Sequence, residues 1–438
     1  MQNYFEFDKH QTNFKTEIIA GITSFLATMY IIVVNPSIVS AAGLPFSGVL
    51  TATILVSAFS SIMMGLYAKN PIVIAPGMGI NAFFAYTVVL GMGVKWEVAL
   101  GAVFWSGIVF LILSIFNVRT AVALAIPKQI RSAVAAGIGL FITLIGLENA
   151  KFVVANPATL VSFGGLNSIT ITFLIGLVVT SFFVMKNIKG ALIIGIAFTT
   201  VLSIPIGRIW GDATELFGTA TIVSWSGILS SPDFSLLFQL DLIGSLALSI
   251  IPVIFVFLFT DLFDSLSTFI GVAEAADLKD EDGEPRNIKE SLLTDAVSTT
   301  ISGLLGTSAG TSYIESAAGI KEGGRTGLTA IVAGLCFLPF MFFSSILSVV
   351  PSIATAPALV LVGVFMMNPV SKIEWLKYDE AIPAFLAIIL IPVTYSITQG
   401  IVWGLITWTL LKILSGKKEE VSLTLIIVDV FAIAVLLV

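Results

Sequence analysis

Long apolar runs recur from one end of this sequence to the other, each about 16–22 residues long. A helix of roughly 20 apolar residues is long enough to cross the hydrocarbon core of a bilayer. Hydrophobic residues make up 57% of the 438 residues and charged residues only 11%, against about 25% charged residues in an ordinary soluble domain. The sequence therefore predicts an all-α polytopic membrane protein.

The runs divide the chain into about fourteen expected membrane spans. A longer, acidic connection that contains tryptophan, residues 207–240, separates the seventh span from the eighth. The last apolar run, residues 423–438, contains Asp429, and it is either an extra span or an interfacial tail. The expected spans cover residues 17–34, 48–67, 72–90, 97–116, 132–147, 168–185, 190–206, 242–270, 290–305, 308–320, 326–346, 354–369, 381–396 and 399–415.

The basic residues agree with this division. With a cytoplasmic N-terminus, only Lys95, Lys151 and Arg208 fall on the outer side, whereas the other 18 of the 21 lysines and arginines fall inside. Such an excess of cytoplasmic positive charge is typical of helical membrane proteins. Residues 1–17 have no small-residue cleavage site, so we expect no cleavable signal peptide. The single Cys336 excludes an internal disulfide.

The two halves of the chain resemble each other weakly. Residues 60–66 are similar to residues 299–304, and in each half a broken, Gly-rich segment follows, residues 70–81 and 306–319. Seven spans per half is an odd number, so the second copy must be inverted in the membrane. Interrupted segments at matching positions of two inverted halves indicate the midplane site of a transporter.

The interrupted segments predict an unusual backbone. Pro71 and Pro76 lack amide donors, and Gly77 relaxes the steric limits. We expect residues 72–75 and 309–313 to be extended and each to be followed by a half-helix. The two half-helix N-termini would meet near the midplane and offer free N–H groups and positive dipole potential. Asn35-Pro36 is expected to end the first span.

Acidic side chains in apolar spans are expensive, and here no intramembrane Lys or Arg accompanies them. Asp264 and Glu315 are the candidate acceptors for the N–H groups of a flat polar ligand, and Asp261 lies three residues from Asp264. Burial of several acids predicts that at least one is protonated at rest, which makes proton coupling plausible. The alternatives are that Glu315 only caps its half-helix and that Asp261 or Asp264 is hydrated at a cytoplasmic helix end. Asp295 is expected to be structural.

Four motifs resemble one family. Residues 75–84 (APGMGINAFF), 261–265 (DLFDS), 306–316 (GTSAGTSYIES) and 4–8 (YFEFD) are similar to those of the AzgA-like purine permeases. These form a branch of the nucleobase–cation symporter family, which is related to the uracil and xanthine permeases. The resemblance covers nearly the whole chain.

The resemblance implies a seven-plus-seven inverted repeat with a core domain, a gate domain and short strands in segments 3 and 10. An N-terminal tail (1–16) and an external connection (207–241) would flank these domains, and a hydrophobic tail (416–438) would follow them. The core would combine residues 17–131 with 242–350, and the gate residues 132–206 with 351–415.

The resemblance also implies function. The substrates would be hypoxanthine, guanine or adenine, imported with protons across a bacterial cytoplasmic membrane, with no cofactor and with a possible homodimer. Asp264 and Glu315 would bind the base, helped by Asn81 and by the backbone near Phe83 and Ser312. The candidate proton-coupling acids are Asp261, Asp264 and Glu315, and Asp261 is the preferred one. The side chains of Phe83 and Phe84 are expected to pack rather than to stack on a ligand. Two rivals remain: an anion carrier of the same architecture, and an intramembrane aspartyl protease.

Overall fold

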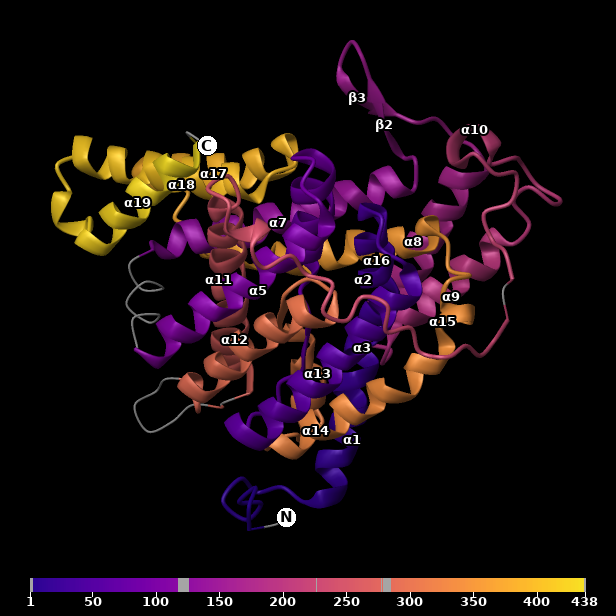
Figure 1. Ribbon diagram of the computed structural model, residues 1–438, viewed down its shortest axis with the longest axis horizontal. Coiled ribbons are helices and arrows are strands. Elements are labelled where there is room, and N and C mark those ends of the chain that lie inside the picture. The colour runs from indigo at the N-terminus through magenta and orange to yellow at the C-terminus, as the bar shows by residue number, and fades with distance from the viewer. Residues whose placement is uncertain (1–2, 117–125, 226, 277, 279–284, 437–438) are drawn as a thin grey trace.

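The computed structural model describes residues 3–116, 126–225, 227–276, 278 and 285–436, most of them helical (Figure 1). Within these ranges, eight helical segments are long and apolar enough to cross a membrane, and two shorter apolar helices accompany them. This confirms a multi-pass helical membrane protein. Arg119 and Lys279, which contribute to the charge pattern, lie outside the described residues.

The first half of the chain begins with a span that is broken at Met29 and Tyr30. A second break replaces the start of the third expected span by a short strand, after which a short α-helix continues with π-helical geometry. The elements are α1 (Phe14–Thr28), α2 (Ile31–Val39), the 3₁₀-helix η1 (Ser40–Ala42), α3 (Phe46–Met63), the π-helix η2 (Met64–Ala68), β1 (Ile74–Pro76), α4 (Met78–Ala82), the π-helix η3 (Phe83–Gly91), α5 (Trp96–Ile115), α7 (Lys128–Asn149), β2 (Val153–Asn156), β3 (Leu160–Phe163), α8 (Ser168–Met185) and α9 (Ala191–Ser203).

The second half repeats this pattern, because a strand again interrupts its third segment. Its elements, with η marking 3₁₀-helices, are α10 (Thr214–Phe217), η4 (Gly244–Leu246), α11 (Ile251–Ala276), α12 (Ile288–Leu305), β4 (Gly310–Ser312), η5 (Ile314–Ser316), α13 (Ala317–Lys321), α14 (Gly327–Phe337), η6 (Leu338–Phe343), α15 (Ser344–Leu347), α16 (Ser352–Met366), η7 (Asn368–Lys372), α17 (Tyr378–Thr394), α18 (Ile397–Leu414), η8 (Lys418–Glu420) and α19 (Leu423–Leu436).

The strands β1 and β4 form an antiparallel pair that joins the two halves. Ile74 pairs with Ser312, Ala75 with Thr311, and Pro76 with Gly310. All of these residues are buried. The pairing supplies the hydrogen bonds that non-helical backbone needs inside a membrane protein. The predicted extended segments are thus confirmed, displaced by one or two residues from the expected bounds at 72 and 309.

Two expectations about helix ends are wrong. Helix α11 begins at Ile251 and not near residue 242. The preceding residues turn because the Asp241 carboxylate accepts the amides of Ile243 and Gly244 at 3.1 and 2.8 Å. In addition, the first span does not end at Asn35-Pro36: α2 continues to Val39, and the side chain of Asn35 is fully buried.

Small residues allow the helices of the two halves to approach closely. A β-carbon added to Gly65 would lie 2.2 Å from the Gly327 carbonyl oxygen, and one added to Gly107 would lie 2.4 Å from the Thr300 amide nitrogen. These contacts join η2 to α14 and α5 to α12. Glycine at such positions permits backbone-to-backbone packing, which is a common basis of helix association in membranes.

The C-terminal run forms α19, whose 14 residues extend only about 21 Å at 1.5 Å per residue. That length is shorter than the roughly 30 Å hydrocarbon core. Helix α19 lies beside α18, where Thr409 Oγ1 donates to Asp429 Oδ2 at 2.6 Å.

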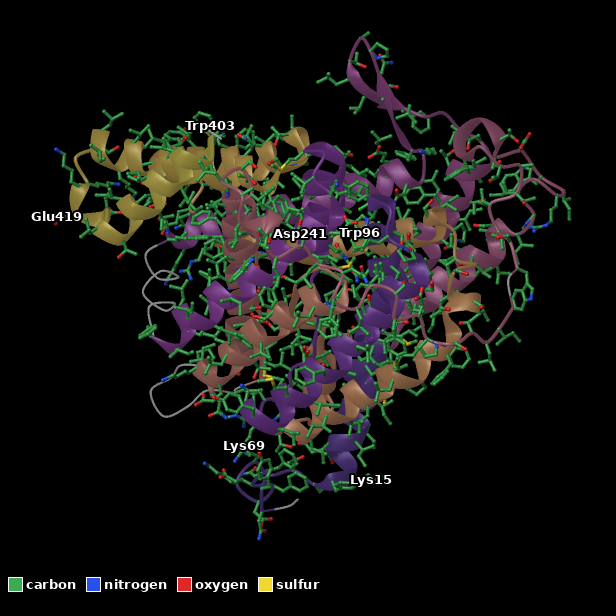
Figure 2. All side chains as sticks on the ribbon, in the orientation of Figure 1. Lys15, Lys69, Trp96, Asp241, Trp403 and Glu419 are labelled. Carbon is green, nitrogen blue, oxygen red and sulfur yellow. The ribbon has the colours of Figure 1, made fainter. Side chains whose placement is uncertain are left out.

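Different segments lie at the two ends of the molecule. The N-terminus lies at one end, and the antiparallel hairpin of β2 and β3 projects at the other (Figure 1). Lys15 and Lys69 lie at the N-terminal end (Figure 2). Both residues belong to the predicted cytoplasmic set, and the orientation of the chain in the membrane stays a prediction.

Candidate functional site

Two half-helices start where the crossed strands end. Beyond the strand pairing, the Gly77 amide donates to Ala309 O and the Tyr313 amide to Val73 O, both at 2.9 Å. Helix α4 then begins at Met78 and η5 at Ile314, and neither the Gly77 nor the Tyr313 cap position supplies a side-chain acceptor for the first turn. First-turn amides have no partner within their own helix. The fold therefore presents two sets of N–H donors beside a short buried sheet.

Helix α11 runs along β4 and brings Asp264 to it. Thr311 Oγ1 donates to Asp264 Oδ2 at 3.3 Å. One residue further along each element, Ser312 Oγ donates to Ser265 O at 3.3 Å, and the Ser312 amide donates to Ser265 Oγ at 3.4 Å. Asp264 is half-buried and lies midway along α11, not at a helix end.

Glu315 meets a residue that the sequence did not single out. Tyr30 Oη donates to Glu315 Oε1 at 2.8 Å. Tyr30 is 1% exposed and sits at the break between α1 and α2. Asp264 contacts Thr311 of β4, and Glu315 lies in η5 directly after that strand, so the structure brings the two predicted acids to the same segment. A tyrosine within the apolar first span was the only available signal for this contact.

Asp261 faces a different neighbour from Asp264. It is fully buried, and its Oδ2 accepts a hydrogen bond from Thr299 Oγ1 at 2.5 Å. Thr299 lies on α12 and also contacts Gly310 O of β4 at 3.2 Å. Asp295 is likewise fully buried on α12. The two acids of α11 therefore contact separate elements, Asp264 the strand and Asp261 the adjacent helix.

Two of the expected backbone donors have other partners. The Phe83 amide donates within its own helix to Gly79 O and Ile80 O, so the expectation that it faces a ligand is corrected. The free donors of this half-helix are the first-turn amides of residues 78–80. The Phe83 side chain packs edge-to-face on Phe257 with ring centroids 5.0 Å apart. Ser312 is tied to Ser265 through both its amide and its hydroxyl group.

Asn81 belongs to a buried polar network. Its Nδ2 donates to Asn35 Oδ1 at 3.0 Å, and both residues are fully buried. Asn35 also contacts Thr53 of α3 and Thr307, which precedes β4. The network therefore joins four segments around the two half-helices. The sequence did not predict this role of Asn35, because Asn-Pro is also a common helix-ending pair.

Comparison with known proteins places the chain in a family. Residues 15–403 match the Xan_ur_permease profile of the Permease family. The chain is 42% identical over 431 residues to the adenine permease AdeP of Escherichia coli (strain K12), covering 98% of this chain and 94% of that one. The chain belongs to this permease family.

A second relative supports the same assignment. The guanine/hypoxanthine permease PbuO of Bacillus subtilis (strain 168) is 40% identical over 422 residues, which cover 95% of this chain and 96% of the relative. Permeases are transporters, so the family assignment is consistent with a protein that is not an enzyme. The resemblance drawn from the four motifs is confirmed at the level of the family.

A solved structure has the same fold. The transmembrane domain of the cyanobacterial bicarbonate transporter BicA superimposes with a TM-score of 0.64, covering 90% of this chain and 97% of that one. The two sequences are only 14% identical, so the likeness concerns the architecture alone. It confirms the predicted fold class for this permease.

Proposed function

We propose that this permease imports purine nucleobases, which bind between the half-helices that begin at Met78 and Ile314. The observation that supports this most is the placement of Asp264 at β4 and of Glu315 in the half-helix that follows it, beside two sets of helix N-terminal amides. A purine carries N–H donors and carbonyl or ring-nitrogen acceptors in one plane. Carboxylates accept from the donors, and the amides donate to the acceptors. Full-length relatives named as adenine and guanine/hypoxanthine permeases support the same class of substrate.

Import is driven by protons in this proposal. Asp261 is the preferred proton carrier, because it is fully buried and contacts α12 rather than the strand that faces the base. Placing a charge at such depth is costly. Protonation of this acid removes that charge and lets the substrate-bearing core move. The core comprises residues 17–131 and 242–350, and it slides in an elevator-like motion against the gate, residues 132–206 and 351–415.

The proposal also covers the orientation of the chain in the membrane and its oligomeric state. The N-terminus faces the cytoplasm of a bacterial cell, since the inside assignment gathers most of the lysines and arginines on one side. Two copies form a homodimer. An anion carrier of the same architecture is disfavoured, because the central acids would repel an anion.

The test is uptake of radiolabelled hypoxanthine and adenine into bacterial cells that lack their own purine permeases. Unlabelled guanine, xanthine and uracil serve as competitors, at two external pH values. We expect saturable uptake that rises at acid pH and that purines compete for. Absence of uptake with the protein present in the membrane would refute the purine assignment, and uptake of bicarbonate or sulfate in the same cells would favour an anion carrier.

A further inference from the structure

One buried acceptor at the site has no partner. Within the described part of the chain, Asn81 Oδ1 is buried and accepts no hydrogen bond. Buried polar atoms are nearly always paired, so each exception needs a physical explanation. Asn81 lies on α4, the half-helix whose first-turn amides are uncapped.

The orientation of the Asn81 amide follows from its neighbour, Asn35. Thr53 Oγ1 donates its only proton to Val49 O at 2.6 Å, so the Thr53 oxygen must act as an acceptor toward Asn35. The Asn35 atom that lies 2.7 Å from it is therefore the nitrogen, Nδ2. The same nitrogen also donates to Thr307 Oγ1 at 2.8 Å.

With its nitrogen engaged in this way, Asn35 presents its oxygen to Asn81. Two groups donate to Asn35 Oδ1: Asn81 Nδ2 at 3.0 Å and Ser308 Oγ at 3.5 Å. Rotating the Asn81 amide by half a turn would place two carbonyl oxygens against each other. Asn81 therefore holds its nitrogen toward Asn35 and its oxygen away from it.

We propose that Asn35 is a positioning residue that fixes the Asn81 amide so that Asn81 Oδ1 accepts a hydrogen bond from an N–H group of the bound purine. This inference rests on the proposed function. It also predicts one property of the substrate: the purine must carry a hydrogen-bond donor at the position that faces Asn81 Oδ1. A base that presents an acceptor there leaves the Asn81 oxygen unpaired and brings two lone pairs together. Sites built in this way reject the mismatched analogue strongly.

The experiment compares isosteric purines whose donors and acceptors are exchanged. Hypoxanthine is paired with adenine, and 7-deazahypoxanthine with 9-deazahypoxanthine, as competitors of radiolabelled purine uptake. In the unsubstituted protein we expect the inhibition constants to differ by about tenfold or more within at least one pair, which corresponds to about 1.4 kcal/mol. Asn81→Ala should abolish the difference within that pair. The pair affected then identifies the position of the purine that Asn81 recognises.

The variant Asn35→Ala frees the Asn81 amide to turn over. We expect the inhibition constants of the discriminated pair to converge by about tenfold, because either face of the amide becomes available. Asn35→Asp retains an acceptor for Asn81 Nδ2 and should preserve the discrimination. The matched control is Ser106→Ala, since Ser106 is fully buried on α5 and its hydroxyl bonds only locally, to Val103 O at 2.7 Å.

Several results would overturn the inference. An Asn35→Ala protein with an unchanged ratio of inhibition constants would do so, and so would one in which every constant changes by one common factor. The second pattern is that of a merely structural residue. Equal inhibition constants within both pairs in the unsubstituted protein would show that the site does not require a donor on the base. If no purine competes at all, the proposed function itself fails, and the two failures are therefore distinguishable.

Discussion

Lys189 Nζ lies 3.1 Å from Glu322 Oε1 and joins the loop between α8 and α9 to the end of α13. Lys189 also lies 3.4 Å from Thr23 Oγ1 on α1. In the proposed division of the chain, Lys189 belongs to the gate, while Glu322 and Thr23 belong to the core. In that division this ion pair crosses the boundary between gate and core, and the proposed sliding motion would break it.

The variant Lys189→Glu should shift the balance between conformations, since two acids would then face each other. Both side chains are partly exposed, at 47% and 39%, so the effect is screened by solvent and should be modest, up to about fivefold in the uptake rate. The double variant Lys189→Glu/Glu322→Lys should restore the wild-type rate. Failure of the exchanged pair to restore it would show that the contact has no role in the motion.

Asp264→Asn and Glu315→Gln should each lower purine uptake on the order of 100-fold or more, because each replaces an acceptor for a buried N–H group by an amide. Membrane abundance should remain normal. Quantitative immunoblotting of the membrane fraction is the check on abundance, and radiolabelled uptake measures the loss. Wild-type uptake by either variant would refute the site assignment.

Tyr30→Phe removes the hydroxyl group that donates to Glu315. The loss of one hydrogen bond of about 1 kcal/mol should raise the KM for purine roughly fivefold. The maximal rate should change less, because the acid itself remains. An unchanged KM in an uptake titration would show that this contact does not orient Glu315. The control is Tyr4→Phe, which removes a contact to Leu66 O far from the site.

Gly65→Ala should destabilise the fold, because the new methyl group would lie 2.2 Å from the Gly327 carbonyl oxygen. Overpacking of this kind costs about 1–3 kcal/mol of unfolding free energy. Thermal unfolding of the purified protein in detergent measures the effect. The adjacent Leu66 is 47% exposed, and Leu66→Ala should leave the midpoint nearly unchanged. Equal midpoints for the two variants would contradict the close packing of η2 on α14.

The N-terminal tail should loosen in acid. Arg286 Nη1 lies 3.2 Å from His10 Nδ1, and burial, Arg286 and Lys9 lower the pKa of His10 below 6.5, whereas Glu6 and Glu17 act in the opposite direction. The folded state thus favours neutral His10. Its stabilising contribution is complete above about pH 6.5 and is lost as the pH falls through the lower, folded-state pKa.

Limited trypsin digestion of the tail tests this expectation. The wild-type protein should become more sensitive than His10→Gln as the pH falls from about 7.5 to 5.5. Comparing the two proteins at each pH cancels the pH dependence of the protease. Glu6 does not interfere in this window, because Lys9 keeps the Glu6 pKa below 4.5. Equal cleavage rates of the two proteins at every pH would show that His10 does not cause the loosening of the tail.

Much of the architecture followed from the sequence, because apolar run length decides where a helix can cross a bilayer. The broken segments could be predicted as well, since Pro71, Pro76 and the glycines exclude a continuous helix there. The start of α11 could not, because the turn at Asp241 depends on one carboxylate while the apolar run continues through it.

The sequence singled out the acids of the candidate site and Asn81, but it assigned no site role to the neutral residues Tyr30 and Asn35. Asp264 and Glu315 were conspicuous because acids are rare in apolar spans. Tyr30 and Asn35 carry no charge. Within one span alone, each looks like a residue that ends the helix or packs in the apolar core. Their roles arise from contacts with Glu315 and Asn81 in other spans, which no single stretch of sequence reveals.

The pairing of β1 with β4 also bears on how the chain is made. Ile74 leaves the ribosome long before Ser312, its pairing partner, so β1 cannot pair with β4 until the intervening helices have been synthesised. Contacts so distant along the chain form slowly. The first half of this permease therefore cannot complete the crossed strands alone, and the candidate site forms only after both halves have been inserted.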